Sequence, residues 1–200
     1  HFVVNGQVTT DLEHFIDSLN IELEKYDDKD FRKINILNEL GTAYAMYDRN
    51  QELKFYYEAY RLAKAINHPE NLSRTALNIS SYHHLSANFD SSMIFAKEAL
   101  VYCRKNNFYE QEAKSLLQIG INYGRLGDYK NLNLFVFESI KISEKHNFPS
   151  TLANAYNSLG AHYYEISKDD DALKYFKKSK AIFEVNLHLE NSMTMLSTIE

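Results

Sequence analysis

The chain of 200 residues has a formal net charge of −5, and its Lys and Arg residues are scattered along it. Nucleic-acid binding by this segment is therefore not expected, because a phosphate backbone attracts clustered cations. Hydrophobic residues make up 44% and charged residues 24%, which excludes a disordered chain, and only six Gly and two Pro favour long helices over a strand-rich fold.

Residues 1–10 are interpreted as an N-terminal tail. The run from His1 to Gln7 passes from apolar to small and polar residues, which fits either the end of a secretory signal peptide cleaved near Gln7 or a plain terminal extension. The first interpretation favours a periplasmic or other extracytoplasmic location over the cytoplasm, and the compartment stays open. No apolar run approaches the roughly 20 residues of a membrane span.

After the tail, apolar residues recur at spacings of three and four, which predicts amphipathic helices. In chain order the predicted helices span 12–26, 31–47, 51–66, 70–87, 90–106, 110–126, 129–146, 150–167, 170–186 and 190–200. Pro69 and Pro149 suit first helical positions, and Gly127 suits the residue that ends a helix. The predicted N-caps are Asp48, Asp90, Asp128 and Asp169.

A repeat organises these helices. Four strings share a large aliphatic residue, a small residue, two variable residues and a ring, namely 40–44, 79–83, 119–123 and 159–163. Their small residues, which are separated by 39, 40 and 40 positions, are Gly41, Ser80, Gly120 and Gly160. Counting twelve positions further predicts an inward-facing position on each second helix, occupied by Leu53, Ser92, Leu132 and Ala172. A column of rings for packing between repeats follows, with Tyr56, Phe95, Phe135 and Tyr175.

The pattern resembles the tetratricopeptide repeat, in which paired helices cross closely at a small residue. The usual period of this family is about 34 residues, and longer units like these are familiar from bacterial signalling receptors. Ser80 and His83 depart from the usual glycine and tyrosine, and HEAT-type repeats stay open as an alternative. The resemblance implies an all-α, right-handed superhelical solenoid of antiparallel helix pairs. It divides residues 11–200 as one array into a half-unit 11–30, units 31–69, 70–109, 110–149 and 150–188, and a truncated fifth unit 189–200.

The resemblance also implies a concave groove, lined by the first helices, that binds a peptide or protein. Asn amides there offer donors and an acceptor to a peptide backbone, and Arg and Lys side chains can pair with acidic groups. A solvated polar face is the alternative for each residue. The predicted groove residues are Asn35, Asn38, Thr42, Arg74, Asn78, Ser81, His84, Lys114, Gln118, Arg125, Asn154, Asn157, Ser158 and Tyr164.

A second predicted surface lies on the second helices, where apolar residues exceed the needs of two-layer packing. It is interpreted either as a patch for a homodimer or another partner, or as extra core for long helices. Its residues are Phe55, Ile94, Leu134 and Phe137.

No catalytic, cofactor or metal site is predicted. Cys103 has no nucleophile motif around it, and the adjacent His83 and His84 point apart on a helix. His162 and Glu165 form an i, i+3 pair without a second such pair.

The sequence therefore predicts a non-catalytic binding domain, the sensory or scaffold part of a larger bacterial signal-transduction protein such as a histidine kinase or transcriptional regulator. The alternatives are a cytoplasmic peptide-responsive regulator and a plain assembly adaptor.

Overall fold

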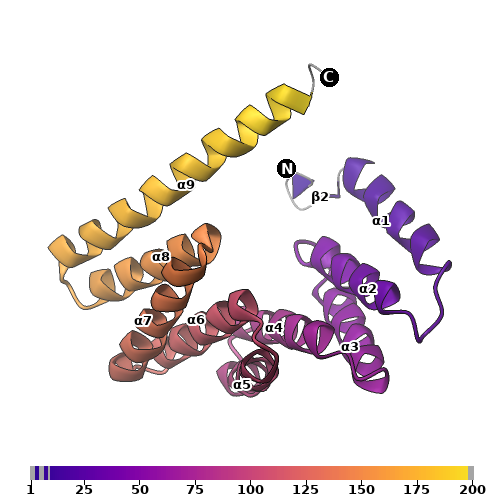
Figure 1. Ribbon diagram of the computed structural model, residues 1–200, viewed down its shortest axis with the longest axis horizontal. Coiled ribbons are helices and arrows are strands. Elements are labelled where there is room, and N and C mark those ends of the chain that lie inside the picture. The colour runs from indigo at the N-terminus through magenta and orange to yellow at the C-terminus, as the bar shows by residue number, and fades with distance from the viewer. Residues whose placement is uncertain (1–2, 5–6, 9, 198–200) are drawn as a thin grey trace. The chain divides into compact units, whose positions relative to one another are not determined.

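The structure is a computed structural model that describes residues 3–4, 7–8 and 10–197. Two short strands, β1 (Val3–Val4) and β2 (Gln7–Val8), pair antiparallel before the first helix. The helices are α1 (Thr10–Leu23), α2 (Phe31–Tyr44), α3 (Arg49–Ala65), α4 (Pro69–Leu85), α5 (Phe89–Asn106), α6 (Tyr109–Arg125), α7 (Tyr129–His146), α8 (Pro149–Glu165) and α9 (Asp169–Ser197) (Figure 1). The predicted all-α class is confirmed, although the sequence did not predict the strand pair.

The chain forms two compact units, residues 1–106 and residues 107–200, here called the N-terminal and C-terminal units. Within each unit every helix packs on the helix that follows it, and α2 with α3, α4 with α5, α6 with α7 and α8 with α9 are the tightest pairs. The predicted antiparallel helix pairs are therefore present. The single array and its right-handed superhelix stay predictions. In the described residues, no helix combines the length and apolar character needed to cross a bilayer.

Each pair crosses at the small residue of its repeat; Gly41, Ser80, Gly120 and Gly160 are called the crossing residues below. A methyl group on Gly120 would lie 2.7 Å from Val136 Cγ2 and 3.2 Å from the Leu132 carbonyl oxygen. At Gly160 the same methyl group would meet the ring of Phe176 at 2.6 Å. Ser80 keeps its place by donating its hydroxyl to the Ser92 carbonyl oxygen at 2.8 Å. Small side chains are therefore required by contact at the crossings.

One ring stack per pair fixes the rotation of each second helix. The pairs and their centroid distances are Tyr44–Phe55 at 5.4 Å, His83–Phe95 at 5.9 Å, Tyr123–Phe135 at 5.5 Å and Tyr163–Tyr175 at 5.4 Å. All four are close to parallel, and such stacks stabilise beyond their buried area. The predicted rings are thus present in three repeats, and in the first repeat Phe55 takes the place of Tyr56. These four stacks lie within a helix pair, whereas the sequence predicted packing between repeats.

The register predicted for α3 is wrong by one residue. Gly41 meets Tyr56 fifteen positions later, whereas Gly120 meets Val136 and Gly160 meets Phe176 sixteen positions later. The cause is the turn after α2, which ends at Tyr44, so that Asp48 N–H donates directly to the Tyr44 carbonyl oxygen at 3.0 Å. Glu52, and not Leu53, is therefore the inward residue that corresponds to Ser92, Leu132 and Ala172.

The helix starts follow local chemistry in most repeats. Asp48 accepts from the N–H groups of Asn50 and Gln51, and Asp128 accepts from Asn131 N–H, as N-caps do. The N-cap predictions for Asp90 and Asp169 are wrong because both lie within the first helical turn. The cap of α5 is Asn88, whose Oδ1 accepts from Ser91 N–H at 3.2 Å.

The last two predicted helices are one helix. Asn67, Asn107 and Asn147 follow the second helices at intervals of 40 residues, each with φ between 53° and 59°. Asn tolerates this left-handed backbone, which ends a helix. Position 187, forty residues after Asn147, holds Leu, for which that conformation is costly. The predicted break between 170–186 and 190–200 is therefore wrong, and α9 continues to Ser197.

We expect Gly120→Ala to lower the free energy of unfolding by about 1–2 kcal/mol, because overpacking against the α7 backbone exceeds the gain in helix propensity of about 1 kcal/mol. Gly124→Ala is the matched control, since its new methyl group would meet only the movable Leu132 Cδ1. Urea unfolding of both variants measures this difference. Equal stability of the two would contradict the backbone-contact explanation.

Candidate functional site

In the N-terminal unit, a polar network joins the first helices α2 and α4. One guanidinium nitrogen of Arg74, Nη2, donates hydrogen bonds to Asn35 Oδ1 and, at 2.8 Å, to Asn71 Oδ1. Asn78 donates to Asn38 Oδ1 at 2.8 Å. Four predicted groove residues, two from each helix, are thus brought together by the packing of α2 on α4.

Arg74 is the unusual member of this network. It is partly buried, its hydrogen-bond partners are neutral amides, and its Nε atom is buried without a partner among the described residues. Burial lowers the pKa of the guanidinium, and the more distant Glu70 and Glu39 act in the opposite direction. A partly desolvated cation whose hydrogen-bond partners are neutral amides would be stabilised by an anion.

Asn38 differs from the groove residue that the sequence predicts. Its side chain is only 5% exposed, and its Nδ2 donates to the Ile34 carbonyl oxygen at 2.8 Å and to Thr75 Oγ1 at 2.9 Å. With Oδ1 bonded to Asn78, every polar atom of the amide has a partner inside the protein. Asn38 therefore holds α2 against α4 instead of offering its amide to a ligand.

The other predicted residues of this unit lie nearer the surface. Thr42 is exposed, and its hydroxyl contacts the Asn38 carbonyl oxygen at 3.0 Å and Tyr56 Oη at 3.2 Å. Ser81 is exposed, and the half-buried His84 has its ring 5.6 Å from that of Phe89. Asn71 and Thr75 belong to the same network but were missed, because their side chains point between the helices and not along the predicted face.

In the C-terminal unit, two predicted residues on α6 are paired locally. Lys114 Nζ lies 2.6 Å from Glu110 Oε1, with both side chains about half exposed; an exposed pair of this kind contributes little to stability. Gln118 donates to Asn122 Oδ1 at 3.3 Å. On α8, the predicted residues Asn154 and Asn157 are exposed, as is Tyr164, which is 68% accessible.

A cavity of about 220 Å³ lies between α6, α7 and α8 of this unit. It includes the predicted residues Arg125, Asn157 and Ser158, and Arg125 Nη1 lies 3.7 Å from Glu165 Oε1. The remaining lining residues, which the sequence did not assign to a site, are Ile121, Gly124, Leu132, Ala161, His162 and Glu165. The cavity therefore brings three of the predicted groove residues together in one hollow of the C-terminal unit.

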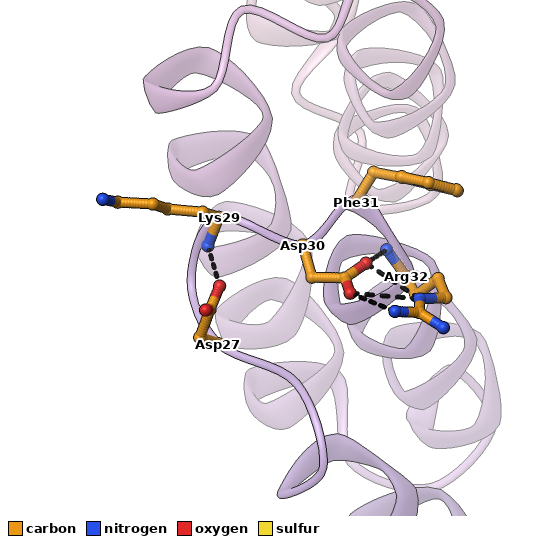
Figure 2. A pocket seen from close by; sticks show the side chains of 5 residues that line it. All are labelled: Asp27, Lys29, Asp30, Phe31 and Arg32. Atoms are coloured by element: carbon orange, nitrogen blue, oxygen red, sulfur yellow. Dashed lines mark hydrogen bonds and ion pairs between the residues drawn. The ribbon is translucent and has the colours of Figure 1, made fainter.

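A second hollow, of about 580 Å³, lies at the loop before α2 (Figure 2). Asp30 caps α2 by accepting from Arg32 N–H at 2.8 Å, and it also pairs with the Arg32 guanidinium. Asp27 accepts from Lys29 N–H at 2.8 Å. These carboxylates stabilise the loop and the start of α2 through hydrogen bonds to nearby residues.

The predicted patch on the second helices is correct in exposure except at Phe55. Ile94, Leu134 and Phe137 are 64%, 60% and 44% exposed. Phe55 is half-buried in its stack with Tyr44, because the short turn after α2 rotates it into the column of rings. Lys54 occupies its expected place on the surface.

Known structures with the same arrangement of helices identify the fold. No protein-family model matches the sequence, and no curated protein matches it either. A signal-transduction ATPase from Pyrococcus horikoshii with a tetratricopeptide repeat sensor aligns over 90% of this chain and 28% of its own, with 20% identity and a TM-score of 0.71. The chain has a tetratricopeptide-like fold.

Two Rap structures share this tetratricopeptide-like fold. A Rap protein in complex with competence and sporulation factor has 20% identity and a TM-score of 0.76, over 90% of this chain and 52% of its own. The apo form of RapI has 19% identity and a TM-score of 0.74, over 92% of this chain and 68% of its own. At these identities the similarity establishes the fold alone. What this chain binds has to be inferred from its own residues.

We expect Asn38→Ala to lower the free energy of unfolding by about 1–3 kcal/mol, because it leaves Thr75 and Asn78 with unpaired polar atoms between helices. Asn154→Ala, at an exposed position of a first helix, is the control and should change it by less than about 0.5 kcal/mol. Chemical denaturation measures both. A stability loss that is no larger for Asn38→Ala would contradict the structural role of this amide.

Proposed function

We propose that this chain is a non-catalytic domain that binds an acidic peptide segment of a partner protein through the network of Arg74, Asn35 and Asn78. The observation that carries the proposal is the partly buried guanidinium of Arg74, which has amide partners and an unpaired Nε. A ligand carboxylate would supply the missing charge. The neighbouring amides and the exposed Ser81 and Thr42 offer further hydrogen bonds to an extended backbone.

The similar structures support a role of this kind in signalling. One is described as a Rap protein complexed with competence and sporulation factor, and another as a signal-transduction ATPase with a repeat sensor. We infer that the chain is the sensory or scaffold part of a larger bacterial signal-transduction protein, such as a histidine kinase or transcriptional regulator. A cytoplasmic peptide-responsive regulator and an assembly adaptor are the alternatives, and residues beyond the present sequence would distinguish them.

The test uses an array of eight-residue peptides that vary in acidic content, followed by calorimetry on the tightest binder. We expect Arg74→Met to weaken binding roughly 10- to 100-fold, which corresponds to the loss of one charge-assisted hydrogen-bond pair. Lys114→Met, which removes an exposed cation already paired with Glu110, should change it less than about threefold.

Thermal unfolding of each variant must show that the fold is retained. Failure of acidic peptides to bind better than neutral ones, or equal effects of the two substitutions, would refute the proposed role of Arg74.

A second proposal concerns the exposed apolar side chains of α7. Leu134 and Phe137 lie one helical turn apart and are 60% and 44% exposed, and neighbouring exposed apolar side chains can form part of an interface patch. We propose that they contact a second copy of the chain. Leu134→Ser with Phe137→Ser should convert a dimer to a monomer in analytical ultracentrifugation without lowering the melting temperature. Leu85→Ser, at a 73% exposed leucine of α4, is the control; a monomeric wild-type chain would contradict the proposal.

A further inference from the structure

The cavity between α6, α7 and α8 is lined at two positions by smaller side chains than the corresponding positions of neighbouring repeats carry. Gly124 lies forty residues from both His84 and Tyr164. Ser158 lies forty residues after Gln118 and eighty after Asn78. These two small residues distinguish the lining of this cavity from the equivalent positions of the neighbouring repeats.

The walls combine an apolar interior with a polar rim. Ile121, Leu132 and Ala161 supply aliphatic surface, and Leu132 Cδ1 packs directly against Gly124, so closely that a methyl group on that glycine would meet it. At the rim, Arg125 and Glu165 form a long ion pair of 3.7 Å between side chains that are about half exposed. A volume of about 220 Å³ suits one large side chain of a partner and not a whole peptide, and binding pockets of this composition orient their occupant through a few polar groups.

His162 gives the cavity a buried polar group. The side chain lines the cavity, is 3% exposed, and has a buried Nδ1 atom without a hydrogen-bond partner among the described residues. Its ring lies 4.7 Å from that of Tyr129 and 5.2 Å from that of Tyr163. Burial lowers the pKa of His162, Lys168 acts in the same direction and Glu165 acts against them, which favours the neutral imidazole. A neutral imidazole has one donor and one acceptor nitrogen, and a buried unpaired one costs free energy.

We propose that this cavity binds the side chain of a tyrosine from a partner protein, with the phenol ring against Ile121 and Leu132 and its hydroxyl bonded to His162 Nδ1. This inference rests on the proposed peptide-binding function and adds a preference for one residue type. A phenol satisfies both features of the cavity, because it brings an apolar ring and a single hydrogen-bonding group at its far end. Phenylalanine would fill the same space but leave Nδ1 unpaired.

The test uses N-acetyltyrosinamide and N-acetylphenylalaninamide as probes, titrated into the isotope-labelled chain while the backbone amides of Gly124 and Ala161 are followed by NMR. We expect the tyrosine probe to bind about 2- to 10-fold more tightly than the phenylalanine probe, as one net hydrogen bond allows. His162→Phe should remove this preference while leaving weak binding of both probes.

Ala161→Ile places in the cavity the side chain that the preceding repeat has at Ile121, and it should abolish binding of both probes. The control is Ala181→Ile, at an exposed position of α9, which should leave binding unchanged. Absence of shifts at Gly124, or binding that survives Ala161→Ile, would overturn the tyrosine pocket. If acidic peptides still bound through Arg74 in that case, the proposed function would stand and only the pocket would fall. If His162→Phe does not fold, equal affinity of the wild-type chain for the two probes is the outcome that refutes the role of Nδ1.

Discussion

The close crossing of each first helix with its second helix is the contact on which the rest of the structure depends. At Gly41, Gly120 and Gly160 the facing side chain or backbone occupies the volume that a methyl group would need. Because interiors are packed to high density, this approach fixes the separation of the helices. The ring stacks then fix their rotation. Separation and rotation together determine which residues of each pair point inward and which are left for a ligand.

The candidate site follows from this packing through the placement of charge. Lys114 and Arg125 are exposed and paired with carboxylates on the surface, where water and salt weaken such interactions. Arg74 lies deeper, between two first helices, and its partners are neutral amides. Basic residues at similar repeat positions can thus differ in how much a bound anion would stabilise them, and the difference depends on how deeply each is buried.

The repeat could be predicted far more completely than the site. The period and the crossing residues follow from side chains that recur about every forty positions. The helix starts at Pro69 and Pro149 follow from a local preference of proline for the first helical position. The single helix α9 could also have been anticipated, because Leu187 stands where three earlier repeats have an Asn. The displaced register of α3 also had a signal, because the first interval between crossing residues is 39 residues and the next two are 40. That interval shows that one residue is missing, but it does not show that the missing residue belongs to the turn after α2.

By itself the sequence determined the helical class and the inward face of α5, α7 and α9, because those depend on spacings of three, four and forty along the chain. Tertiary structure alone decided that Asn38 is enclosed, that Phe55 stacks on Tyr44, and that His162 lines a cavity. Each of these outcomes depends on atoms from two or three helices meeting at distances of a few ångströms. These contacts depend on loop length and on the volumes of facing side chains. The sequence pattern of a single helix does not contain that information.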